Sequence, residues 1–221
     1  MTVALSLIFA MLLSALGGAL ALATMAERQM AGGHDRGVEA LYAADGAAER
    51  AMQDLPGIAD WTAVVNGAAR SSFVDGAPGG ARMLPDGTAL DLTNLTNELR
   101  CGRATGCTDA QMNAATAERP WGTNNPRWQL FAYGPLDSLL PDGVRSPFYV
   151  IVWVADDAAE GDGRPLVDGD PNTDGSTNTG RDVVTLLAHA YGVAGSRRMV
   201  EVTVARAAAG IRILAWREVR S

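Results

Sequence analysis

The hydrophobic pattern of the chain begins with a long apolar run at the N-terminus. Residues 1–26 are apolar or small and polar, and the first charged residue is Glu27. As an α-helix this run would measure about 40 Å, which is long enough to cross the hydrocarbon core of a bilayer. A helix that is apolar on all sides needs surroundings without water, which means lipid or other copies of the same helix.

The helical pattern continues from residue 27 to residue 55 but becomes amphipathic. Charged residues enter, while one apolar stripe persists at close to helical spacing, through Leu41, Ala44, Ala48, Ala51 and Leu55. Pro56 and Gly57 then end the helix. We therefore expect one long helix with an apolar half, 1–26, and an amphipathic half, 27–55, which lies on a globular head at 56–221.

The head carries segments that are typical of β-strands. The strongest is 148–155, where an unbroken apolar run predicts burial on both faces. In 199–206, alternation places Val200, Val202 and Val204 on one face. Further strands are expected at 127–133, 183–191 and 211–219, helical turns at 93–100 and 108–112, and a short strand or helical turn at 61–65. The pattern predicts an α+β fold, with an antiparallel sheet of about four strands packed against the helix.

Composition and charge exclude several classes of protein. The chain has a net charge of −7, and all 18 of its basic residues are Arg. An acidic head without a basic cluster argues against nucleic acid as a partner. The sequence contains no nucleophile elbow, phosphate-binding loop or zinc-ligand spacing, so we do not expect an enzyme. The two histidines, His34 and His189, lack a neighbouring metal ligand and are expected to be structural.

The two cysteines, Cys101 and Cys107, enclose a short polar loop that is rich in glycine. Their spacing does not fit a CxxC metal or redox motif. A disulfide that closes this loop is expected if the head lies outside the cytoplasm. Two buried free thiols are the alternative.

The segment 156–182 is crowded with Asp, Asn and Gly. The stretch from Asp170 to Gly175 matches the opening of an EF-hand loop, but Arg181 stands where that loop has its Glu. Asp156 or Asp182 would have to supply the missing carboxylate. We expect either a solvated acidic turn or a Ca²⁺ site with ligands from Asp168, Asp170, Asn172, Asp174 and Asn178.

An apolar N-terminal helix that continues directly into an Ala-rich amphipathic half resembles a type IV pilin. The start Val3-Ala4-Leu5, the helix segments 27–31 and 39–51, and the C-terminal segments 200–206 and 216–219 are similar to the PilX-like group of pilus assembly proteins. Major pilins carry Glu at the fifth mature position, where this chain has Leu5. An apolar run that starts without a charged flank is typical of a chain whose leader has been removed.

The resemblance implies that the chain is a processed prepilin. Met1 would then be the first mature residue and a site of N-methylation. It also implies an inner-membrane anchor before assembly, and then an extracellular filament on a bacterial surface that contains copies of this chain, other pilins or both. Because each Gly in a helix costs about 1 kcal/mol relative to Ala, we expect the helix to loosen at Gly17 and Gly18 within a filament.

Two other functions fit the same pattern. A pseudopilin of a type II secretion system would use the same helix in the same way. A membrane-anchored extracytoplasmic binding protein that never polymerises would instead need a pocket with convergent polar groups.

Overall fold

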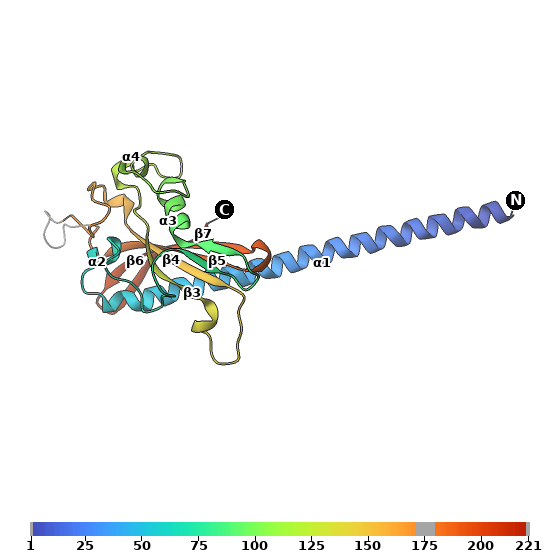
Figure 1. Ribbon diagram of the computed structural model, residues 1–221, viewed down its shortest axis with the longest axis horizontal. Helices are drawn as coiled ribbons and strands as arrows, with labels where there is room; N and C mark the ends of the chain where they lie inside the picture. Colours follow the sequence, from blue (N-terminus) through green and yellow to red (C-terminus); the bar gives the residue numbers. More distant parts are fainter. Residues whose placement is uncertain (1, 171–179, 220–221) are drawn as a thin grey trace. The chain divides into compact units, whose positions relative to one another are not determined.

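The computed structural model describes residues 2–170 and 180–219, and Figure 1 shows its elements. The chain divides into two compact units, Met1–Glu39 and Ala40–Ser221. Helix α1, Thr2–Asp54, contributes to both units. The second unit adds α2 (Thr62–Val65), α3 (Leu92–Cys101), α4 (Asp109–Met112), β1 (Ala81–Met83), β2 (Ala89–Asp91), β3 (Gln129–Pro135), β4 (Tyr149–Asp156), β5 (Val183–Tyr191), β6 (Arg197–Ala207) and β7 (Gly210–Val219).

The part of α1 in the first unit is helical throughout the described residues. It passes through Gly17 and Gly18 without a break, and a Cβ added to either glycine would meet nothing within 4 Å. The expected loosening at these glycines concerns a helix packed in a filament, so it stays a prediction.

In the second unit, α1 packs on the sheet through a face made of alanine. Methyl side chains spaced three or four residues apart let the helix approach the sheet closely and lose no rotamer entropy on burial. They share one core with valines of β4 and β6; the helix contributes Ala40, Ala43, Ala44, Ala47, Ala48 and Ala51 to it. The predicted α+β fold, a long N-terminal helix packed on an antiparallel sheet, is confirmed. Among the described side chains of α1, the buried ones begin at Ala40.

The C-terminal end of α1 is held by polar contacts as well as by the predicted Pro56 and Gly57. The Asp54 carboxylate accepts hydrogen bonds from the Ser71 hydroxyl, the Ser72 amide and Arg50. Burial by itself raises the Asp54 pKa, but these hydrogen bonds outweigh it, so the pKa lies below its ordinary value. The end of the helix is therefore tied to the 71–72 segment.

Trp61 closes the core directly after this helix end. Its side chain is fully buried, and its indole Nε1 donates to the Leu55 carbonyl at 3.1 Å. The guanidinium of Arg206 lies 4.6 Å from the Trp61 ring centroid and donates to the Ile58 carbonyl at 2.9 Å. The segment 61–65, expected as a strand or a helical turn, forms the helical turn α2.

The main sheet is an antiparallel meander of five strands in the order β3-β4-β5-β6-β7. All five expected strand segments are present, so the estimate of about four strands was one too low. β1 and β2 form a separate two-stranded hairpin. It lies in the segment 66–91, which is rich in Gly, Pro, Asp and Ser and for which the sequence predicts a loop with brief strands.

The two faces of the sheet are covered by different elements. Every residue of β4 is buried, as its continuous apolar run predicted. Val150, Val152 and Val154 face the α1 side, and Val200, Val202 and Val204 of β6 join the same core, which confirms the predicted alternation. Ile151 and Trp153 face a second core under α3, where the Trp153 indole donates to the Thr96 hydroxyl at 2.9 Å.

Candidate functional sites

The apolar half of α1 exposes large hydrophobic side chains on all sides. Within the described residues, α1 is long and apolar enough to cross a membrane by length and composition. The side chains that are 55–70% exposed in this unit include Leu7, Phe9, Met11, Leu12, Leu13, Leu16, Leu20, Leu22 and Met25. Monomeric soluble proteins rarely leave so large an apolar surface in water. This segment is therefore a candidate surface for contact with lipid or with partner helices.

The second candidate site is a cluster of carboxylates at the C-terminal end of β4. The acidic cluster consists of Asp156, Glu160, Asp162 and Asp168. Asp156 is the last residue of β4 and is only 4% exposed. Asp156 Oδ1, both carboxylate oxygens of Glu160 and Asp162 Oδ2 are buried and have no hydrogen-bond partner. The structure thus gathers negative charge in a place that it shields from water.

The pKa values of the cluster record this burial and repulsion. Burial, together with the charges of Glu160 and Asp168, raises the pKa of Asp156 to about 8. Burial and the neighbouring Asp162 and Asp168 raise the pKa of Glu160 to about 7. The nearby Gly169 amide partly offsets this rise in the Glu160 pKa, although it makes no hydrogen bond of normal geometry with the Glu160 carboxylate. Because the folded state holds these protons more firmly than the unfolded state, the bare cluster destabilises the fold as pH rises from about 4 through 8.

The predicted calcium ligands are only partly described. Asp168 and Asp170 lie in the described residues, whereas Asn172, Asp174 and Asn178 lie outside them. Asp168 Oδ1 accepts a hydrogen bond from the Asp182 amide at 2.8 Å. Among the described residues, no group of three or more His, Cys, Asp or Glu side chains is already arranged to hold a metal ion.

Of the two carboxylates considered as substitutes for the missing Glu, the structure favours Asp156. Asp182 is engaged elsewhere, because its carboxylate pairs with Arg206 at 2.6 Å. Asp156 instead turns an unpartnered oxygen into the acidic cluster. The sequence carried a signal for this, since Asp156 directly follows the apolar run 148–155. Glu160 and Asp162 were visible only as members of an acidic segment.

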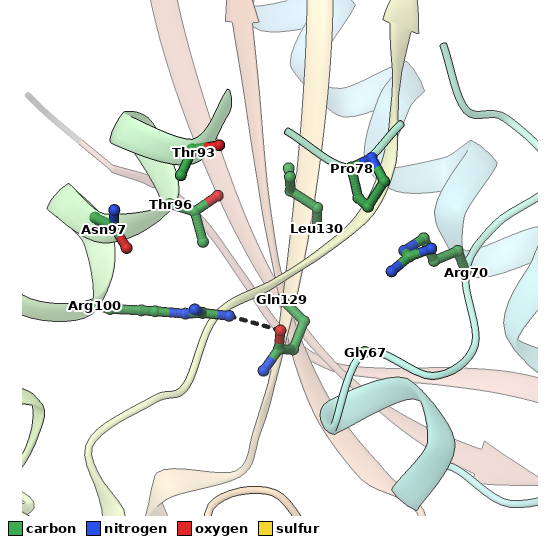
Figure 2. A pocket seen from close by; sticks show the side chains of 9 residues that line it. All are labelled: Gly67, Arg70, Pro78, Thr93, Thr96, Asn97, Arg100, Gln129 and Leu130. Carbon is green, nitrogen blue, oxygen red and sulfur yellow. Dashed lines mark hydrogen bonds between the residues drawn. The ribbon is translucent and has the colours of Figure 1, made fainter. Parts of the chain in front are cut away.

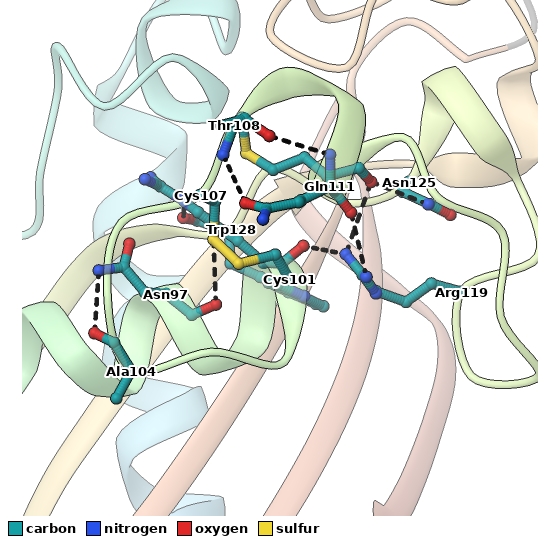
Figure 3. Close-up of a disulfide and its surroundings, with 11 residues drawn as sticks. Asn97, Cys101, Ala104, Cys107, Thr108, Gln111, Arg119, Asn125 and Trp128 are labelled. Carbon is teal, nitrogen blue, oxygen red and sulfur yellow. Dashed lines mark hydrogen bonds between the residues drawn. A yellow bond between two sulfur atoms is a disulfide. The ribbon is translucent and has the colours of Figure 1, made fainter.

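The two cysteines form a disulfide, with the sulfurs 1.99 Å apart and the Cα atoms 6.0 Å apart (Figure 3). Cys101 ends α3, and Gly102 follows it in the left-handed conformation that commonly terminates a helix. Just after Cys107, Thr108 and Gln111 form a reciprocal capping box at the start of α4. The bond therefore joins the end of α3 to the beginning of α4 and closes the loop 102–106.

A pocket between α3 and β3 has the polar lining that a binding protein would need but little space. Figure 2 shows Arg100 reaching from α3 toward Gln129 on β3. The Arg100 guanidinium donates to Gln129 Oε1 at 2.6 Å and to the Trp128 carbonyl at 2.7 Å, so these donors are already occupied. The volume is about 170 Å³, below the ~300–1,000 Å³ typical of ligand sites. A second pocket, lined by Arg50, Ser72 and Asp75 among others, has a volume of about 480 Å³, which lies within that range.

The two edges of the main sheet differ. The outer edge of β3 is covered by the 71–75 segment, whose Ser71 and Asp75 amides donate to the Phe131 and Tyr133 carbonyls, both at 2.9 Å. Among the described strands, β7 pairs with β6 alone, and it exposes apolar side chains, Ile213, Leu214 and Trp216. Trp216 is fixed by a hydrogen bond from Nε1 to Asp45 Oδ1 of 3.0 Å. An exposed edge strand with apolar side chains is a surface suited to contact with another protein.

His189 has the structural place that the sequence predicted. It is 7% exposed, its Nδ1 lies 2.9 Å from the Tyr191 hydroxyl, and its ring meets Trp153 edge to face at 4.9 Å. Within the described chain its Nε2 has no hydrogen-bond partner. Burial lowers the pKa of His189 to about 3. His34 is exposed on α1, and the structure places the two histidines in different units.

Replacing His189 with Phe is expected to reduce the loss of stability on acidification. The folded-state pKa of about 3 lies below the ordinary value of 6.5, so the unfolded state binds the proton first and stability falls as pH drops below 6.5. At pH 5 this amounts to about 2 kcal/mol, which the variant does not lose. Urea unfolding at pH 7 and pH 5 measures the difference. His34→Gln is the control, and an equal acid response in all three proteins would contradict the assignment.

Comparisons with protein-family models, with curated proteins and with solved structures found no match to this chain. The similarity to PilX-like pilins therefore rests on the sequence segments given above.

Proposed function

We propose that this chain is a structural subunit of a type IV pilus or pilus-like filament, polymerised through its N-terminal helix. The observation that carries the proposal is the division of α1. From Ala40 onward the helix buries an alanine face against its own head, whereas large apolar side chains nearer its start, such as Phe9, Leu16 and Met25, remain exposed. A partner outside the head must cover them. Lipid covers these side chains before assembly, and copies of the same helix or helices of other pilins cover them in the filament.

The sequence of the exposed helix suits close packing against other helices. Ala10, Ser14 and Gly18 follow one another at four-residue spacing and thus share one face. Small residues at this spacing let helix backbones approach closely where no water drives association. In the filament we expect the heads to lie on the surface, where they serve adhesion, aggregation or motility, with the exposed edge of β7 available for contacts between heads.

Purified surface filaments test this function. Filaments sheared from the source cells and washed free of membrane should contain this chain at a constant ratio to the other subunits, measured by quantitative mass spectrometry. A strain without the gene supplies the control. If the chain stays entirely with the cell membrane while filaments are present, it is an anchored protein and the proposal is wrong.

Gly17 and Gly18 provide a further prediction about the filament. Replacing both with Ala is expected to stabilise the helix by about 2 kcal/mol in total, because each Gly costs about 1 kcal/mol relative to Ala. Amides around these positions should then exchange hydrogen more slowly in variant filaments than in wild-type filaments. A wild-type filament with unbroken helical hydrogen bonds from Leu13 to Leu22 would contradict the expected loosening.

A further inference from the structure

The acidic cluster defined above holds most of the buried side-chain polar atoms that lack a hydrogen-bond partner in the described part of the chain. Five buried side-chain atoms in the described residues lack a hydrogen-bond partner, and four of them belong to Asp156, Glu160 and Asp162. The fifth is His189 Nε2. Buried polar groups without partners are rare in folded proteins, and each one calls for an explanation such as an unobserved ion or water. Their concentration in one place points to a single common partner.

That partner is not a basic side chain of the described chain. Asp182, whose amide donates to Asp168, brings Arg206 near the cluster. The Arg206 guanidinium, however, pairs with the Asp182 carboxylate and lies over the ring of Trp61. None of the ion pairs between described residues includes a member of the cluster. Arg164 and Arg181 are exposed. Burying several carboxylates without a counter-charge is strongly unfavourable, so a bound cation would remove the conflict.

We propose that Asp156, Glu160 and Asp162 bind a calcium ion, with Asp168 adding negative charge beside them. The donors are all carboxylate oxygens, which favours a hard cation over zinc or copper. Asp162 retains a free oxygen for this, because only its Oδ1 accepts a hydrogen bond, from the Arg164 amide at 2.7 Å. This ligand set differs from the EF-hand-like set expected from the sequence, since it begins at the end of β4.

The three carboxylates are not yet gathered around one point, so binding must include side-chain movement. Calcium accepts six to eight oxygens in flexible geometry, and carbonyls or waters complete its shell, whereas magnesium demands a near-ideal octahedron. The position of Glu160 can be tested with a substitution at a neighbouring residue that changes shape but not charge. Its carboxylate lies against Gly180, and a Cβ at that glycine would come within 2.2 Å of it. A methyl group there must displace Glu160 without changing any charge.

Calorimetric titration of the full chain in detergent with CaCl₂ tests the site directly. We expect one calcium per chain with a Kd on the order of 10⁻⁴–10⁻³ M, the range of extracellular calcium modules. At ten times that concentration the melting temperature should rise by about 3–6 °C over its value in chelator. MgCl₂ should give a smaller rise, and NaCl at matched ionic strength should give none.

Three variants separate a calcium site from an acidic turn. Asp156→Asn and Glu160→Gln should lose the calcium-dependent rise, yet melt at or above the wild-type temperature in chelator, because each removes a carboxyl group that the fold must either bury charged or protonate. Gly180→Ala should weaken calcium binding at least tenfold. Asp142→Asn, at an exposed position outside the cluster, should behave as wild type. If calcium gives wild-type protein no heat of binding and no change in melting temperature, or no more than NaCl gives, the proposal is overturned.

Discussion

Replacing Trp61 with Ala is expected to lower the free energy of unfolding of the head by about 3–5 kcal/mol, the usual cost of truncating a fully buried Trp. The Trp61 side chain is completely inaccessible to solvent. Its removal leaves a cavity, takes one of two hydrogen bonds from the Leu55 carbonyl, which keeps the bond from the Ile58 amide, and takes away the ring on which Arg206 lies. Because Arg206 also holds Asp182, the loss should spread to the 182 turn.

Urea unfolding of the full chain in detergent, followed by circular dichroism, measures this loss. Trp121→Ala is the matched control, because Trp121 is 44% exposed, and its removal should change stability by no more than about 0.5 kcal/mol. If both variants lose the same amount, Trp61 has no special place in the core. A loss below about 1 kcal/mol for Trp61→Ala would contradict the packing described for the end of α1.

Replacing Leu12 with Arg is expected to abolish incorporation of the chain into filaments while leaving the head folded. Leu12 lies within the apolar run and is 62% exposed, and under the proposed function its surroundings come from lipid or from neighbouring helices. A charge at the centre of such a helix costs about 3 kcal/mol even in the mildest estimates for a bilayer. In a filament core the cost recurs at every subunit.

The amount of variant chain in sheared filaments, compared with its amount in whole cells, measures incorporation. Gln29→Arg is the control, because it adds the same charge at an exposed position just after the apolar run and should be tolerated. An intact Cys101–Cys107 disulfide and an unchanged head melting temperature show that the head is folded. Normal incorporation of Leu12→Arg would mean that this helix does not lie in an apolar filament core.

The sequence was most informative where one physical pattern dominated. The unbroken apolar run 148–155 and the alternation of Val200, Val202 and Val204 identified strands, because burial on two faces or on one face determines those patterns. The alanine stripe of α1 identified the packed face of the helix in the same way. The Pro56–Gly57 pair correctly predicted where the helix ends.

The contacts that join distant segments could not be predicted. The stacking of Arg206 on Trp61 links residues 145 positions apart, and no local pattern reports such a pair. The acidic cluster was visible as composition only. That Asp156 would be buried, and that Glu160 and Asp162 would lack partners, depends on the path of the chain after β4, which no local pattern specifies. By sequence, Asp182 was an equally suitable ligand. In the structure its carboxylate pairs with Arg206 instead.

The structure of the filament itself tests the central claim most directly. Electron cryomicroscopy of filaments from the source cells should show density for this chain, with residues 2–39 packed among neighbouring helices in the core and residues 40–219 on the surface. Exposed leucines such as Leu12 and Leu13 should contact helices of adjacent subunits. Filaments whose density lacks this chain, or in which its apolar helix lies outside the core, would contradict the account.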